Sequence, residues 1–290
     1  MKGSKNIIMV VLGILIIVIG IFLVYFNISY SPLKNNFNSD FKALNNETNK
    51  KNEYFSREDF SDFPDAIVKY MENNGFIGKE KMDYAYMEYK NVDFAQSPER
   101  KLKIDYSQYN FAHRPNRIAL VESSIFGIPF EGYDYYIDGR GGMHGMLGKM
   151  LTLFHQKGDK MDQGALCTYL SESLFVPSSI LYNKNISFEE IDPFNVKASI
   201  SDGGISVSGI FTFNENYEMT RFYTEDRPAV KDDGSIDNIA WSANILSYKK
   251  YDQGINFIDH VQIIWHYPEG DFVYFDGRID KLIFKSELPA

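Results

Sequence analysis

The feature that most constrains this chain is an unbroken apolar run near its N-terminus, from Ile7 to Phe26. At about 1.5 Å per residue, a helix over this run spans roughly 30 Å, the hydrocarbon thickness of a bilayer. A cleaved signal peptide has a shorter core and small residues at its cleavage site. Here the large Tyr25, Phe26 and Tyr30 occupy that position. We therefore expect an uncleaved anchor within residues 1–30, which contacts the lipid bilayer through residues 7–26; a cleaved signal is the alternative.

The charges around the run predict its orientation. Lys2 and Lys5 precede it, so the positive-inside rule places the N-terminus in the cytoplasm and residues after 30 outside the cell membrane; Lys34 is a weak opposing signal. The run contains no ionisable residue, and we assign it no transport role. The sequence predicts a single-pass membrane protein with an extracytoplasmic C-terminal domain.

Composition excludes several function classes. The net charge of -9 argues against nucleic acid as a partner and against electrostatic docking on anionic lipid. Cys167 is the single cysteine, so the chain has no internal disulfide and no multi-cysteine zinc site. A buried thiol is the expected state of Cys167.

The chain divides into three parts. Residues 1–30 form the anchor, residues 31–55 are rich in Asn and Lys and indicate a flexible stalk, and residues 56–290 form the extracytoplasmic domain. The domain begins with a short helix that has Pro64 in its first turn and Gly75 just past its end. A second helix is predicted over residues 162–174, with Asp159 or Asp162 as its cap and Pro177 ending it.

About ten or eleven strands follow one another in hairpins, separated by turns such as Asp202-Gly203-Gly204. Hairpin succession means antiparallel pairing, and a sheet of this many strands curls because its twist accumulates. The fold class is therefore mainly β (α+β), a curved half-barrel sheet with one helix before it and one inserted. The expected strands lie near residues 82–86 and 101–106 and at 117–124, 131–137, 143–154, 195–200, 205–213, 218–224, 240–248, 255–267 and 272–284.

Several strands carry apolar residues on both faces, and too few helices are predicted to cover them. A curved sheet of this kind leaves an apolar hollow. Aromatic and methionine side chains would line it, although ordinary sheet core is the alternative for each. The candidate ligand-binding residues are Tyr136, Met143, Met146, Trp241 and Trp265.

Catalytic and metal chemistry has weak support. The five histidines form no HExxH pattern, and only His144 and His155 are placed to meet across a hairpin, so we expect no metal site and no cofactor. No GxSxG motif occurs. A carboxylate hydrolase would need two acids in one cleft, and a non-enzyme is favoured over it. The acids considered are Asp134, Asp138, Glu172, Glu225 and Asp226.

Several blocks, in order, resemble an uncharacterised bacterial family of membrane-anchored domains of unknown function. They are FPDAIVKYMENNG, YDYYIDGRGGM, MDQGALCTYLSESLFVPSSIL, DGGISVSGIFTFNENYEMTRFYTEDR and YDQGINFIDHVQIIWHYPEGDFVYFDGRI, within about residues 56–285. The chain departs from the family pattern at Phe175, where Trp is usual, and at Ser171, where Ala is common. The resemblance implies an architecture similar to the lipoprotein-carrier (LolA-like) half-barrel and supplies no active residue.

The sequence thus favours a tethered, non-catalytic domain that binds a lipid or another apolar molecule. An envelope protein-interaction or sensor module without ligand is the second hypothesis, and the carboxylate hydrolase is the third.

Overall fold

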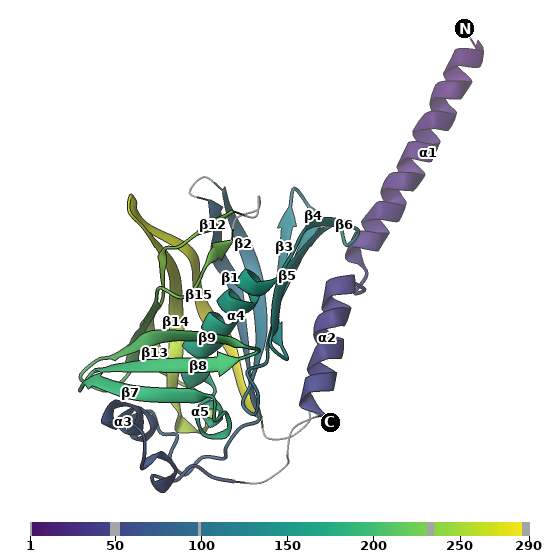
Figure 1. Ribbon diagram of the computed structural model, residues 1–290. Coiled ribbons are helices and arrows are strands. Elements are labelled where there is room, and N and C mark those ends of the chain that lie inside the picture. The colour runs from purple at the N-terminus through teal and green to yellow at the C-terminus, as the bar shows by residue number, and fades with distance from the viewer. Residues whose placement is uncertain (1, 47–52, 98–99, 231–234, 286–290) are drawn as a thin grey trace.

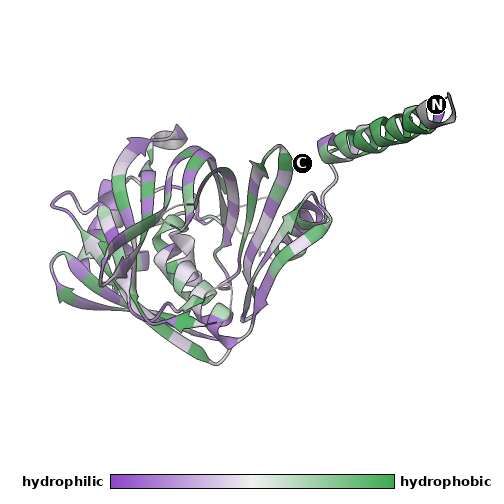
Figure 2. Cartoon of the chain, turned by 90° about the horizontal axis from the view of Figure 1, so that it is seen from above, coloured by the Kyte–Doolittle hydropathy of each residue, from purple (hydrophilic) through white to green (hydrophobic). Residues whose placement is uncertain are grey.

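A computed structural model describes residues 2–46, 53–97, 100–230 and 235–285. Helix α1 (Lys2–Asn27) projects away from the rest of the chain, with its apolar side chains exposed (Figure 1). Coloured by hydropathy, it is hydrophobic along almost its whole length (Figure 2). By length and composition α1 is able to cross a membrane.

Within the described residues, thirteen strands form one antiparallel sheet in the order β6-β5-β4-β3-β2-β1-β15-β14-β13-β10-β9-β8-β7. The expected curved antiparallel sheet is confirmed, with more strands than the turn signals indicated. Its strands are β1 (Tyr84–Ser97), β2 (Arg100–Phe111), β3 (Arg117–Ile125), β4 (Ile128–Ile137), β5 (Arg140–Leu147), β6 (Leu151–Lys157), β7 (Ile186–Asp192), β8 (Asn195–Asp202), β9 (Ile205–Phe213), β10 (Met219–Thr224), β13 (Ala240–Lys250), β14 (Asn256–Tyr267) and β15 (Gly270–Lys285). A separate ribbon pairs β11 (Ala229–Val230) with β12 (Ile236–Asp237).

Two strand predictions are corrected. The single strand expected over residues 143–154 is a hairpin, because the chain turns at Gly148 and Lys149, both with a φ of 61°. Strand β7 was not predicted, because it is a short edge strand whose side chains are mostly exposed and carry no apolar period.

The curved sheet comes together at one corner. The β4–β5 turn at Gly139 meets the β8–β9 turn at Gly203 so closely that a Cβ on Gly139 would lie 2.9 Å from the Cα of Gly203. Tyr136 on β4 also donates a hydrogen bond to Asp202 on β8 at 2.8 Å. This contact, which we call the seam, brings two distant parts of the strand order together.

Helix α4 (Asp159–Ser171) lies inside the curve (Figure 1). Its residues Ala165, Leu166, Tyr169 and Leu170 share the main core with the concave side chains of the sheet, and buried Cys167 is among them. The 3-10 helices η1 (Glu58–Phe60), η2 (Ser173–Phe175) and η3 (Asp252–Gly254) and helix α5 (Ser178–Tyr182) are short. The capping prediction is wrong: Gly158 occupies the N-cap of α4 without a side-chain bond, and Asp162 instead accepts from the backbone N–H of Gly141 at 2.7 Å.

The flexible-stalk prediction is wrong for residues 32–45, which form helix α2 (Pro32–Asn45). Ser31 caps α2, and Leu33, Phe37 and Leu44 are buried against the convex face of β3 and β4. These apolar residues recur at helical spacing between asparagines and lysines, which hid the pattern. The rest of the stalk prediction falls partly on residues 47–52, outside the described residues. Helix α3 (Asp65–Asn73) begins after Pro64, close to where the sequence placed it.

Candidate functional site

The concave face of the sheet is unevenly filled. Toward the end at which β1 finishes and β2 begins, Trp241 and Phe130 are buried, but several other side chains that pack on the main core are only partly buried. These residues are apolar or aromatic and come from strands on both sides of α4. They are Phe94, Leu102, Ile125, Leu147, Phe154, Trp265 and Tyr274.

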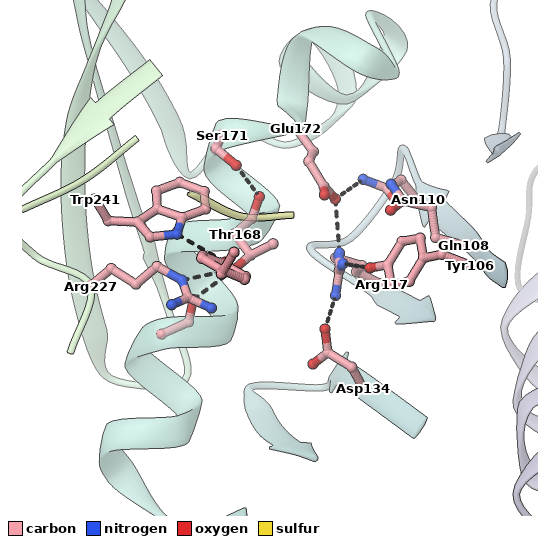
Figure 3. A network of polar contacts seen from close by, with 12 residues as sticks. Tyr106, Gln108, Asn110, Arg117, Asp134, Thr168, Ser171, Glu172, Arg227 and Trp241 are labelled. Carbon is pink, nitrogen blue, oxygen red and sulfur yellow. Dashed lines mark hydrogen bonds and ion pairs between the residues drawn. The ribbon is translucent and has the colours of Figure 1, made fainter. Parts of the chain in front are cut away.

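Trp241 and Trp265 face each other across the β13–β14 pair at this end. The guanidinium of half-buried Arg227, which lies just before β11, is 5.0 Å from the ring centroid of Trp241 and 4.9 Å from that of Trp265. Its Nε also donates to Thr168 Oγ1 on α4 at 3.3 Å (Figure 3). Arg227 is therefore held between the helix and the two indole rings.

Tyr274 completes this group. The indole N–H of Trp241 donates to the phenolic oxygen of Tyr274 at 3.0 Å, and the rings of Trp265 and Tyr274 are stacked with centroids 6.2 Å apart. We call Thr168, Arg227, Trp241, Trp265 and Tyr274 the arginine–aromatic cluster. In the described part of the chain, Arg227 has Thr168 and the two indoles as its partners and forms no ion pair with a carboxylate.

A second arginine has the opposite surroundings. The Arg117 side chain is 3% exposed; its Nη1 lies 2.7 Å from Asp134 and its Nε 2.8 Å from Glu172. It also donates to the hydroxyl of Tyr106, and Asn110 donates to Glu172 at 2.7 Å (Figure 3). Burial alone would lower the pKa of Arg117, but the charge of Glu172 and then of Asp134 keeps that pKa well above its usual value.

The residues around Arg117 therefore form a buried structural network. Asp134 and Glu172 each accept a hydrogen bond from Arg117, so neither carboxylate has the arrangement that an acid/base pair needs. The other acids considered from sequence have separate partners: Asp138 pairs with Arg114, Glu225 accepts a hydrogen bond from Tyr223, and Asp226 accepts one from Ser208.

The remaining candidates from sequence are divided between the two faces. Tyr136 is fully buried at the seam. Met143 pairs with Asp134 and so shares the concave face with it. Met146 packs on the convex face with Tyr133, Leu120 and the α2 residues, so its placement in a shared hollow was wrong. The reason is the two-residue period of a strand, which turns residues three apart to opposite faces.

The histidine pair does meet. The rings of His144 and His155 stack with centroids 4.3 Å apart on β5 and β6, and burial, followed by nearby positive charge, lowers the pKa of both. Among the described residues, no group of three or more His, Cys, Asp or Glu side chains is arranged to hold a metal ion.

Sequence reasoning missed Arg227, Thr168 and Tyr274. They come from a loop, a helix and a strand that are far apart in the chain, and no local motif links them. The one signal was an arginine in the turn-like TEDRPAV segment between two strands.

Comparisons with known proteins bear on the family of this chain. Residues 53–277 match a family of unknown function, DUF6544. No protein with a curated description matches the chain. A solved domain from Vibrio parahaemolyticus described as an outer membrane lipoprotein-sorting protein is 11% identical, with a TM-score of 0.42, over 77% of this chain and 92% of that one. A DUF1329 family protein from Desulfovibrio piger is 12% identical, with a TM-score of 0.40, over 78% and 92%.

Proposed function

We propose that this chain, which belongs to the DUF6544 family of unknown function, is a membrane-anchored domain that binds an amphiphile with an anionic group on the concave face of its sheet. The single observation that carries the proposal is Arg227, a half-buried cation that faces two tryptophans without a carboxylate partner among the described residues. The proposed ligand is a fatty acid, a phospholipid or another molecule with an apolar chain and one acidic head.

Anchoring rests on α1. Its central residues are apolar and exposed, and exposure of so much apolar surface to water is unfavourable by about 25 cal/mol per Å². A bilayer removes that cost and satisfies the length of the helix. The two lysines before the apolar run favour a cytoplasmic N-terminus and hence an extracytoplasmic domain.

The apolar part of the ligand would contact the partly buried side chains around the cluster. Phe94 on β1, Trp265 on β14 and Tyr274 on β15 lie on neighbouring strands at the same end of the sheet. Aromatic rings offer large, rigid apolar area there. In Figure 1 this end of the sheet points to the same side as α1, so a lipid leaving the membrane would meet it first.

The head group would bind Arg227. A cation over an aromatic face gains about 0.5–1 kcal/mol when exposed and about 2 kcal/mol when desolvated, which does not replace a counter-charge. An incoming carboxylate or phosphate would form charge-assisted hydrogen bonds with the guanidinium, each worth about 1.5–3 kcal/mol. Arg117, whose two carboxylates are already in place, offers no such opening.

Native mass spectrometry of the full chain, released from membranes in mild detergent, tests the proposal. We expect an added mass equal to one amphiphile, identified by extraction, in the wild-type protein. The Arg227→Met variant should lose it, while Arg221→Met should retain it, because Arg221 is an exposed arginine over the ring of Tyr223. A wild-type chain that carries no such mass, and gains none when incubated with oleate, would contradict the proposal.

A further inference from the structure

Two turns of the domain expose apolar side chains beside the end of α1. The first is the β3–β4 turn, in which Phe126 is fully exposed and has a φ of 52°, followed by Gly127 at 79°. A two-residue turn with both residues left-handed strongly favours Asn, Asp or Gly. A phenylalanine there gains nothing from packing and fits the turn poorly. Its position calls for a contact outside the described chain.

The second is the β5–β6 turn. Met150, Leu151 and Leu153 are 55%, 59% and 47% exposed, at the turn itself and at the start of edge strand β6. Scattered single apolar residues on a surface are ordinary, but a contiguous group indicates an interaction site.

The two turns lie next to each other. Strands β4 and β5 pair directly, with Phe130 opposite Leu147, and the N–H of Gly148 donates to the carbonyl of Pro129 at 2.7 Å. The β3–β4 turn, at Phe126 and Gly127, comes just before Pro129 in the chain. Phe126, Met150, Leu151 and Leu153 therefore lie at the same end of neighbouring strands, and we call these four exposed residues the apolar tip.

The last turn of α1 packs against the base of the apolar tip. The ring of Phe26 is so close to Gly148 that a Cβ there would lie 3.2 Å from it. The Nζ of Lys149 donates to the carbonyl of Ile28 at 2.7 Å, which holds the chain where it leaves the helix. Tyr25 and Tyr30, aromatic residues with a polar end, lie in the same stretch, as is typical of a membrane–water interface.

We infer that the apolar tip is a second membrane contact, inserted into the outer leaflet beside α1. The inference rests on the proposed anchoring, because α1 fixes the distance between the tip and the lipid. A bilayer is the occupant that these features fit, since Gly148 and Lys149 beside the tip contact Phe26 and Ile28 at the end of α1, and the tip is apolar in an acidic domain. Insertion would hold the domain in one orientation, with the end of the sheet that carries the arginine–aromatic cluster toward the membrane.

Site-directed spin labelling of the full chain in phosphatidylcholine nanodiscs tests this. Single cysteines replace Phe126, Ile16 in α1 and Ile191, an exposed apolar residue on edge strand β7 at the other end of the strand order. The native Cys167 does not interfere, because it is buried and burial raises its pKa to about 12. Collision rates with oxygen, which enriches in lipid, and with a water-soluble nickel complex report the surroundings of each label.

We expect the ratio of oxygen to nickel collision rates to be several-fold higher at Phe126→Cys than at Ile191→Cys, and highest at Ile16→Cys. An aqueous label at position 126 together with a lipid-embedded label at position 16 would overturn the second contact and leave the anchor intact. An aqueous label at position 16 would overturn the anchor, and the second contact with it.

Discussion

The phenolic oxygen of Tyr136 on β4 lies 2.8 Å from the carboxylate of Asp202 at the end of β8, although 66 residues separate them. Burial, together with the negative charge of Asp202, raises the pKa of Tyr136, so the hydroxyl stays a donor over the ordinary pH range. With the adjacent Gly139–Gly203 contact, this bond holds the sheet curled around α4.

Replacement of Gly139 by alanine should open the seam. Its φ of 80° is unfavourable for alanine by about 1–2 kcal/mol, and the new Cβ would also collide with the backbone of Gly203. Gly204→Ala is the matched control, because Gly204 has a φ of 82° but open space around a Cβ. We expect Gly139→Ala to lower the free energy of unfolding, measured by urea denaturation, by at least ~1 kcal/mol more than Gly204→Ala. Equal decreases in the unfolding free energy of the two variants would show that the close Gly139–Gly203 contact does not contribute to stability.

Arg117→Met should be strongly destabilising. It leaves Asp134 and Glu172 without their buried counter-charge, and breaking a buried ion pair from one side costs about 3–5 kcal/mol. Arg114→Met, which removes an exposed arginine paired with exposed Asp138, should cost less than about 1 kcal/mol. Urea unfolding followed by circular dichroism compares the two. If Arg117→Met lowers the unfolding free energy no more than Arg114→Met does, the Arg117 network does not stabilise the fold.

Phe37→Ala should destabilise the domain, because α2 is packed structure. Phe37 is 5% exposed and meets the rings of Tyr109 and Tyr133, and truncation of a buried phenylalanine costs about 3–5 kcal/mol. Asn38→Ala, at the exposed neighbouring position, should change stability by about 0.5 kcal/mol or less. Thermal unfolding of the full chain in detergent is the measurement. Identical midpoints for both variants would mean that α2 is not coupled to the sheet.

Glu131 should make stability depend on pH. Burial raises its pKa above the ordinary 4.5, against the opposing effect of the Ser31 hydroxyl and of Lys149. A group whose pKa is higher in the folded state binds its proton more tightly there, so stability falls as pH rises from about 4.5 through the folded pKa. Glu131→Gln removes this dependence. As pH rises over this range, the unfolding free energy of the wild type should therefore fall relative to that of Glu131→Gln. Unfolding free energies that change with pH in parallel for the two proteins would contradict this prediction.

The sequence predicted those parts of the fold whose signals lie within one short segment of the chain. Helix α1 follows from the apolar composition of one segment, and the bounds of strand β9, Ile205–Phe213, follow from its alternation and its flanking turns. Helix α2 was missed because Asn and Lys residues dilute its apolar stripe to single positions. The opposite faces of Met143 and Met146 were predictable, since three residues is an odd number of strand steps.

The candidate site was less accessible to sequence reasoning. Trp241 and Trp265 were identified as members of one surface, but their pairing depends on the β13–β14 register. Arg227 became a candidate only through its contacts with Thr168 on α4 and with side chains on two strands that follow it in the chain. A contact among such distant segments is created by folding, and no spacing rule in the sequence encodes it.

The most direct test of the proposed binding uses the two tryptophans of the chain, both of which lie in the arginine–aromatic cluster. A brominated fatty acid titrated into the full chain in phosphatidylcholine nanodiscs should quench their fluorescence with a saturable curve. Loss of the charge-assisted bonds in Arg227→Met should weaken the apparent affinity by about tenfold or more, while Arg221→Met should behave as wild type. A wild-type protein without saturable quenching, or an Arg227→Met variant with unchanged affinity, would contradict the account.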